Sequence, residues 1–167
     1  REERSRLQPL KETANYLIDT SNLRPRALQK RIRDIASQAG GEPSLRVDVL
    51  SFGFKRGLPR EGDLVFDVRF LPNPFYIPEL GHHTGLDEDV RTFVLEHPVT
   101  QEFLVKCMDM ISFLLPNYIT EGKHRLVIAI GCTGGRHRSV SVSRRLHWEL
   151  EALGHTVTLR HRDAEKG

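Results

Sequence analysis

The feature that most restricts the fold is an apolar run, Leu126 to Ile130, followed at once by a glycine-rich segment. A continuous apolar run without polar alternation is typical of a strand that is buried on both faces. Such strands occur mainly in parallel sheets, whose crossover connections place helices against the sheet. The run therefore predicts an α/β fold with a mostly parallel sheet flanked by helices.

The rest of the chain fits this fold, because predicted strands and helices alternate along it. Strands are predicted at 45–50, 64–70 and 156–159, and a short one at 16–19. Helices are predicted to begin at Pro25, at Asp87 and near Thr100, and a last one to run from the glycine-rich segment to Leu153. The helix from about Thr100 to Tyr118 carries an apolar stripe that is predicted to face the core: Phe103, Cys107, Ile111, Leu114 and Tyr118.

Length and turn residues indicate two parts. The 167 residues suit one compact domain with a piece of another, and Gly40-Gly41-Glu42-Pro43 interrupts the pattern. We therefore expect a boundary that separates residues 1–42 from residues 43–167. The chain begins at Arg1 rather than at Met, so we expect it to be a shortened form.

Charge and cysteine content restrict the environment. A formal charge of +3 allows an anionic partner but does not require nucleic acid. The 2 cysteines, Cys107 and Cys132, are far apart, which fits a reducing compartment better than a disulfide framework. No signal segment opens the chain, and no apolar run approaches the ~20 residues of a spanning helix. We expect a cytoplasmic protein with no membrane partner.

The segment after the buried run has the composition of an anion-binding site. A strand, a glycine-rich turn and a helix in this order bring free backbone N–H groups to the positive end of a helix dipole. Ligands of α/β proteins bind beyond the carboxyl ends of the strands, where this segment lies. A tight turn with a solvated basic first helical turn would leave its basic residues unexplained, since they oppose the dipole. We predict that the anion contacts Cys132, Thr133, Gly134, Gly135, Arg136, His137, Arg138 and Ser139.

The same segment also fits C-x-x-G-x-x-R-S, the phosphate-binding loop of cysteine-dependent phosphatases. In those enzymes a cysteine thiolate attacks phosphorus while the arginine holds the equatorial oxygens. Here, however, Ile130-Gly131 precedes Cys132, where these phosphatases usually have a histidine, and no general acid stands at a recognisable spacing. Cys132 is equally interpretable as a small buried residue at the end of a strand. A phosphatase is therefore the alternative function.

Longer motifs resemble the RapZ/YvcJ family over nearly the whole chain. They lie at 131–140 (GCTGGRHRSV), 51–55 (SFGFK), 66–74 (FDVRFLPNP), 84–87 (TGLD), 160–162 (RHR) and 18–23 (IDTSNL). The resemblance implies the C-terminal domain of a two-domain protein, preceded by the tail of an N-terminal P-loop domain. No G-x-x-x-x-G-K-[ST] motif occurs in the sequence, so we expect no cofactor here and an ATP or GTP site in the missing domain.

The resemblance also implies a function without catalysis. The family's C-terminal domain is associated with binding glucosamine-6-phosphate. In one branch it is also associated with small regulatory RNA, for which the full protein is an adapter to a ribonuclease in the control of amino-sugar synthesis. We therefore expect a metabolite sensor that forms homo-oligomers and is not an enzyme. The residues expected to contact RNA are Arg160, Arg162 and Lys166.

A second group of candidate ligand contacts follows the strand predicted at 64–70. Alternation places Asp67 and Arg69 on one face, where a carboxylate and a guanidinium suit a ligand that carries hydroxyl or amine groups and a phosphate. A surface ion pair of small energetic value is the other interpretation of these two residues. Asn73 is either a hydroxyl contact or an Asx-turn residue, and Lys55 is either a cation of the site or a surface lysine. His82-His83 has no third ligand at a recognisable spacing, so no metal site is expected.

Overall fold

The computed structural model describes Pro9, residues 13–38 and residues 45–166, and contacts divide the chain into two units, residues 1–43 and 44–167. In the first unit, the helix predicted from Pro25 is α3 (Pro25–Gln38). The strand predicted at 16–19 is wrong: this segment is irregular, with Tyr16 and Leu17 exposed, because a strand needs a neighbour to pair with. The predicted break at 40–43 lies outside the described residues.

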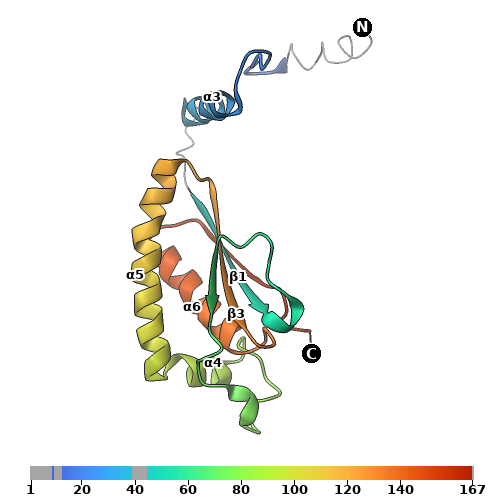
Figure 1. The fold of residues 1–167 in the computed structure, drawn as a ribbon, viewed down its shortest axis with the longest axis vertical. Helices are drawn as coiled ribbons and strands as arrows, with labels where there is room; N and C mark the ends of the chain where they lie inside the picture. The colour runs from blue at the N-terminus through green and yellow to red at the C-terminus, as the bar shows by residue number, and fades with distance from the viewer. Residues whose placement is uncertain (1–8, 10–12, 39–44, 167) are drawn as a thin grey trace. The chain divides into compact units, whose positions relative to one another are not determined.

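The second unit contains a sheet of four parallel strands, as the buried apolar run predicted (Figure 1). The strands are β1 (Arg46–Gly53), β2 (Leu64–Asp67), β3 (Arg125–Cys132) and β4 (Val157–His161), in the spatial order β2-β3-β1-β4. Its helices are α4 (Glu88–Leu95), α5 (Pro98–Glu121) and α6 (Arg138–Ala152). Two 3-10 turns, η1 (Phe54–Arg56) and η2 (Pro74–Tyr76), lie in the loops that follow β1 and β2.

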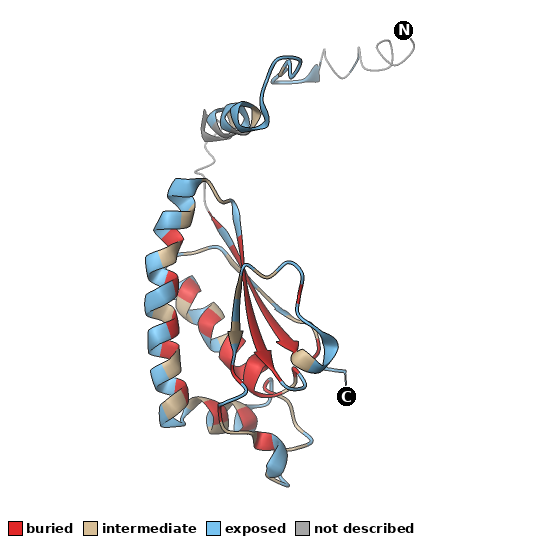
Figure 2. Cartoon of the chain, in the orientation of Figure 1, coloured by how far each residue is buried: buried red, intermediate tan, exposed pale blue. Residues whose placement is uncertain are grey.

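The hydrophobic core lies between the helices and one face of the sheet. Val49 of β1 and Ile128 of β3 pack there with Ile111 of α5 and Leu146 of α6, and all four are fully buried. On the opposite face, Gly62 brings the segment after β1 against Val65 and Ala129. The two central strands are thus buried on both faces, as Figure 2 shows by their red colour. None of the helices in the described residues has the length and apolar character needed to cross a bilayer.

All four strands differ in length from their predictions, and β1 and β2 differ most in where they end. The strand predicted at 45–50 extends to Gly53, because β1 pairs with β3 along its whole length to Cys132. The strand predicted at 64–70 ends at Asp67, whose carboxylate accepts the backbone N–H of Arg69 at 2.9 Å and so favours a turn. Phe70, which lies beyond this end of the strand, is consequently 59% exposed.

The buried stripe of α5 is rotated relative to the prediction. Cys107 and Ile111 are in the core as predicted, and Phe103 and Tyr118 pack against it partly buried. Leu104 and Leu115 are buried as well, whereas Leu114 is only partly buried. The neighbours of the helix decide this rotation, because α5 presents apolar residues on more than one side. The end of α6 is as predicted: Gly154 follows with a φ of 86°, a left-handed conformation that suits glycine.

The strand order creates a crevice between the carboxyl ends of β1 and β3. These strands are neighbours, but the chain leaves β1 toward the face covered by the Gly62 segment and leaves β3 into α6 on the core face. A point where adjacent strands are followed by connections on opposite faces is the usual ligand-binding position of an open α/β sheet. The fold therefore places the segment 131–139, called the anion loop below, at this position.

Candidate functional site

The anion loop packs tightly against the end of β1. A Cβ atom on Gly53 would lie 2.5 Å from the carbonyl carbon and oxygen of Gly134, so only glycine allows this approach. Gly135 has a φ of 79°, a conformation that side chains rarely adopt, and a Cβ there would lie 2.6 Å from the nitrogen of Gly53. A Cβ on Gly134 would meet no atom within 4 Å, so this residue borders open space.

The turn presents backbone donors that the protein does not use. Within the described part of the chain, the N–H groups of Gly134, Arg136 and His137 donate to no acceptor, whereas the N–H of Gly135 donates to the Sγ of Cys132 at 3.3 Å. Helix α6 begins directly after them, so its positive end adds to the same position. These donors can bind an anion.

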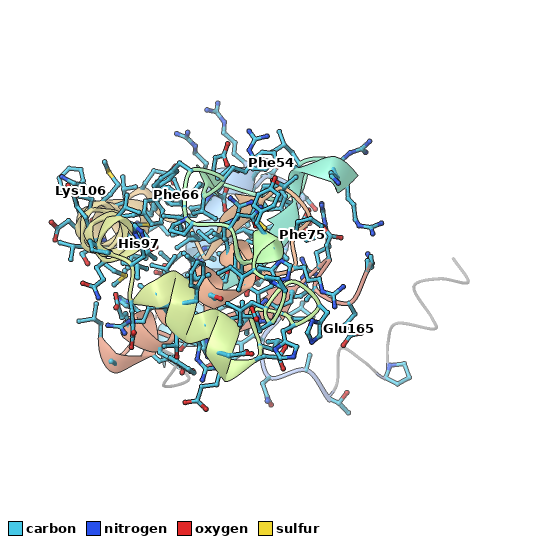
Figure 3. The ribbon with its side chains drawn as sticks, turned by 90° about the horizontal axis from the view of Figure 1, so that it is seen from below. Phe54, Phe66, Phe75, His97, Lys106 and Glu165 are labelled. Carbon is cyan, nitrogen blue, oxygen red and sulfur yellow. The ribbon has the colours of Figure 1, made fainter. Side chains whose placement is uncertain are left out.

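A pocket of about 230 Å³ opens over this turn. Figure 3 looks from below, toward the carboxyl ends of the strands, and labels Phe54 and Phe75 on this side of the molecule. The pocket is lined by Lys55, Asn73, Phe75, Tyr76, Cys132, Thr133, Gly134, Arg136, His137 and Arg138. Three of these side chains are cationic and none is a carboxylate, so the pocket suits a negatively charged ligand.

Two buried side-chain nitrogens of the pocket have no hydrogen-bond partner in the described chain. They are the Nε2 of His137 and the Nε of Arg138, whose side chains are buried almost completely. Buried polar atoms are nearly always paired, so two unpaired nitrogens among the residues of one pocket indicate a polar group that comes from outside the chain. Burial also lowers the pKa of His137, as do the neighbouring charges of Arg136 and Arg138, while nearby backbone groups of His83 oppose this in part.

Arg138 fixes one wall of the pocket with its other nitrogens. Its Nη1 donates to the carbonyl oxygens of Arg69 at 2.5 Å and Leu71 at 3.1 Å, and its Nη2 donates to the Oγ1 of Thr133 at 3.3 Å. The loop after β2 is thereby attached to the anion loop. This attachment places Asn73 and the turn η2 at the rim.

Arg136 attaches a second loop to the anion loop. Its guanidinium donates to the carbonyl oxygens of His82 at 2.5 Å and His83 at 3.2 Å, and its own carbonyl accepts the N–H of Gly85 at 2.9 Å. His83 also pairs with Asp89. No group of three His, Cys, Asp or Glu side chains in the described ranges is placed to hold a metal ion.

The two cysteines have different surroundings. Cys107 lies in the core, where burial raises the pKa of its thiol to about 12. Cys132 is also buried, but its Sγ lies 3.1 Å from the Oγ of Ser139 and lines the pocket. Ser139 and Gly135, both predicted ligand contacts, lie behind the pocket wall rather than on it.

Asp67 and Arg69 form a pair beside the pocket. The Arg69 guanidinium binds the Asp67 carboxylate in a forked geometry, with distances of 2.6 to 3.0 Å, and lies 4.2 Å from the centroid of the Phe54 ring. This pairing lowers the pKa of Asp67. Neither side chain lines the pocket. The carbonyl oxygen of Arg69, however, accepts a hydrogen bond from Arg138, which does line it.

The rim contains a predicted residue and two that were not predicted. The Oδ1 of Asn73 accepts the N–H of Phe75 at 3.4 Å, so the Asx-turn interpretation holds; the residue also lines the pocket. Phe75 and Tyr76 are 63% and 80% exposed, with their rings in an edge contact at 5.7 Å. Two adjacent aromatic residues in a proline-rich loop were the signal in the sequence that would have identified them.

The three residues expected to contact RNA are engaged within the chain. Arg160 of β4 pairs with Glu61 at 2.9 Å. Arg162 binds the carboxylate of Asp163 at 2.7 Å, and the Nζ of Lys166 lies 3.5 Å from the same carboxyl group. An RNA phosphate would have to compete with these contacts.

Comparison with known proteins identifies the family. Residues 45–165 match the family model described as the RapZ C-terminal domain. The chain belongs to this family. It is 54% identical over 165 residues to a nucleotide-binding protein of Lachnoclostridium phytofermentans, an alignment that covers 99% of this chain and 58% of that protein.

Other relatives of this chain are also described as nucleotide-binding proteins. A nucleotide-binding protein of Clostridioides difficile is 49% identical over 162 residues, which are 97% of this chain and 57% of the relative. One from Caldicellulosiruptor saccharolyticus is 50% identical over 164 residues, which are 98% of this chain and 56% of the relative. The chain thus spans a little more than half the length of these relatives.

Proposed function

We propose that this chain is the ligand-binding part of a regulatory protein, and that it binds a phosphorylated amino sugar, glucosamine-6-phosphate, without catalysis. The observation that carries the proposal is the pair of buried, unpartnered nitrogens of His137 and Arg138 in one cationic pocket. A phosphate group supplies several acceptor oxygens, which is what these nitrogens and the free N–H groups of the turn require.

The charges of the pocket favour phosphate. Lys55, Arg136 and Arg138 line it, and α6 points its amino end toward it. Because an anion at a helix amino end is stabilised by the free N–H groups and the dipole, the phosphate is expected at the turn formed by Thr133 and Gly134. The remainder of the ligand then extends toward Asn73 and η2.

The size and rim of the pocket favour a small ring-shaped metabolite. A volume of about 230 Å³ is below the roughly 300–1,000 Å³ of pockets for drug-sized ligands, which disfavours a nucleotide. The Asn73 amide can bind a hydroxyl group, and the exposed rings of Phe75 and Tyr76 can cover the apolar face of a sugar.

The proposal is tested by calorimetric titration with glucosamine-6-phosphate, inorganic phosphate and unphosphorylated glucosamine. We expect saturable binding of the phosphorylated sugar and much weaker binding of glucosamine. Arg138→Ala should weaken binding by about 1.5–3 kcal/mol through the loss of a charge-assisted hydrogen bond. Arg145→Ala is the control, since Arg145 pairs with Glu149 on α6 and does not line the pocket. Equal affinity for both sugars would exclude the proposal.

The relatives support a wider role for the whole protein. They are described as nucleotide-binding proteins, and the sequence of this chain has no P-loop motif. We propose that the nucleotide site lies in the part of the protein outside this chain. The full protein would then act in the cytoplasm as a homo-oligomeric adapter that connects the sugar phosphate to a small RNA and a ribonuclease.

A cysteine-dependent phosphatase is the second candidate, and one observation favours it. Gly135 and Ser139 surround the Sγ of Cys132 with potential donors, as a thiolate nucleophile requires. The guanidinium of Arg138, however, is held by two carbonyl oxygens and Thr133 instead of being free for a transferred phosphoryl group. This engagement makes binding the better supported function.

A further inference from the structure

A buried carboxylate lies behind the anion loop. Asp163 is only 1% exposed and follows β4, at the start of the C-terminal segment. Its Oδ2 accepts the backbone N–H of Gly53 at 2.8 Å and the Nε and Nη2 of Arg162 at 2.9 and 2.7 Å. We propose that residues 162–166, called the C-terminal clamp below, hold the anion loop in its binding shape, with Asp163 as the positioning residue.

The contacts run without a gap from Asp163 to the ligand pocket. A Cβ on Gly135 would lie 2.8 Å from the Cβ of Asp163 and 2.6 Å from the nitrogen of Gly53. Gly53 in turn touches the carbonyl of Gly134, which lines the pocket. Because these backbones are packed as closely as atoms allow, a shift of Asp163 moves Gly53 and the turn together.

The clamp also makes contacts with the segment that follows β1. Arg162 donates to the carbonyl oxygens of Gly53 at 3.2 Å and Gly57 at 2.8 Å, and its guanidinium lies 5.4 Å from the centroid of the Phe52 ring. Arg56 donates to the carbonyl of Lys166 at 2.9 Å. Releasing Arg162 would leave the buried carboxylate of Asp163 with only Lys166, at 3.5 Å, as a charged partner, which is costly. Docking of the clamp and ligand binding are therefore linked, and each strengthens the other.

The ionisation of Asp163 agrees with this arrangement. Burial by itself would raise the pKa of the carboxyl group, but the hydrogen bonds from Arg162 and from the Gly53 N–H outweigh it, so the pKa lies below its ordinary value. The carboxylate is thus charged at neutral pH and holds both partners.

The first experiment compares Asp163→Asn with a matched control, Asp48→Asn, by titration with inorganic phosphate and glucosamine-6-phosphate. Asp48 is also largely buried and binds Arg46 at 2.9 Å and Arg125 at 2.6 Å, but at the other end of β1. Both substitutions are expected to lower the melting temperature. Only Asp163→Asn should raise the Kd, by about tenfold, as the loss of one charged contact predicts. Equal Kd values for the two variants below their melting temperatures would overturn the inference.

The titrations of the first experiment rest on the proposed function. The second experiment needs no ligand, so it tests the clamp independently of that function. Amide hydrogen exchange is compared in Asp163→Asn, Arg162→Gln and Asp48→Asn. We expect at least about tenfold faster exchange at the hydrogen-bonded amides of Gly53 and Gly135 in the first two variants only, because local opening becomes easier. Unchanged exchange at these amides in both clamp variants would refute the clamp. Phosphate that fails to bind the unsubstituted protein would count only against the proposed function.

Discussion

The backbone N–H of Gly135 donates a hydrogen bond to the Sγ of Cys132 across 3.3 Å, so the thiol is held inside the turn that borders the pocket. This contact is what a phosphatase nucleophile requires, yet it also satisfies a buried thiol in a binding loop. We expect the second interpretation to hold. Cys132→Ser should leave turnover of an aryl phosphate at the level of buffer, as in the unsubstituted protein. Turnover that depends on Cys132, together with fast alkylation of Cys132 by iodoacetamide at neutral pH, would instead establish an enzyme.

The pH dependence of stability should report His137. Because burial lowers the pKa of this residue, the unfolded state binds the proton more tightly. The free energy of unfolding should therefore reach its full value above the ordinary histidine pKa of about 6.5. It should fall as pH decreases below that value, by up to ~1.4 kcal/mol per pH unit for one proton. His161, whose pKa burial also lowers, acts in the same direction.

Sulfate, a dianion throughout this pH range, separates the two histidines. A bound anion favours the protonated imidazole of His137, so sulfate should reduce the loss of stability at low pH. The measurement is urea denaturation between pH 5 and 8, with and without sulfate. His137→Asn should remove the sulfate effect, whereas His161→Asn should keep it. An equal sulfate effect in both variants would place the anion elsewhere.

The exposed ring of Tyr76 should select ligands that contain a ring. Stacking on a sugar face requires the aromatic surface but not the hydroxyl group. Tyr76→Ala should therefore weaken binding of glucosamine-6-phosphate by about 0.5–1.5 kcal/mol and leave binding of glycerol phosphate unchanged. Tyr76→Phe should restore the affinity. Phe113→Ala, which removes another exposed ring, from α5, is the control in the same titrations.

RNA binding by this chain should be weak and sensitive to salt. Arg160 pairs with Glu61 and Arg162 with Asp163, so RNA phosphates must displace carboxylates before they bind. Contacts of this kind weaken steeply with salt because binding releases counterions. The test is a gel-shift titration of a structured small RNA at low and near-physiological salt, repeated with Arg160→Ala. The absence of binding at low salt would leave the metabolite as the ligand of this chain.

Residues close together in the sequence gave the more reliable predictions. The parallel α/β sheet followed from the apolar run 126–130, and the place of the anion loop between a strand and a helix followed from its glycines. Both depend on local chemistry: a strand without polar residues must be covered on both faces, and a glycine-rich turn before a helix exposes N–H groups. Seven of the eleven predicted ligand contacts line the pocket, among them Arg138 and Asn73.

The sequence by itself therefore determined the fold class, the family and the position of the loop. Only the tertiary structure decided which side chains line the pocket. Asp67 and Arg69 pair with each other beside the pocket, while Phe75 and Tyr76 reach its rim because Arg138 binds two carbonyl oxygens of their loop. The contact of Asp163 with Gly53 could not be predicted from the sequence either. Asp163 is 110 positions from Gly53 in the chain, and only the parallel pairing of β1 with β4 brings the two together.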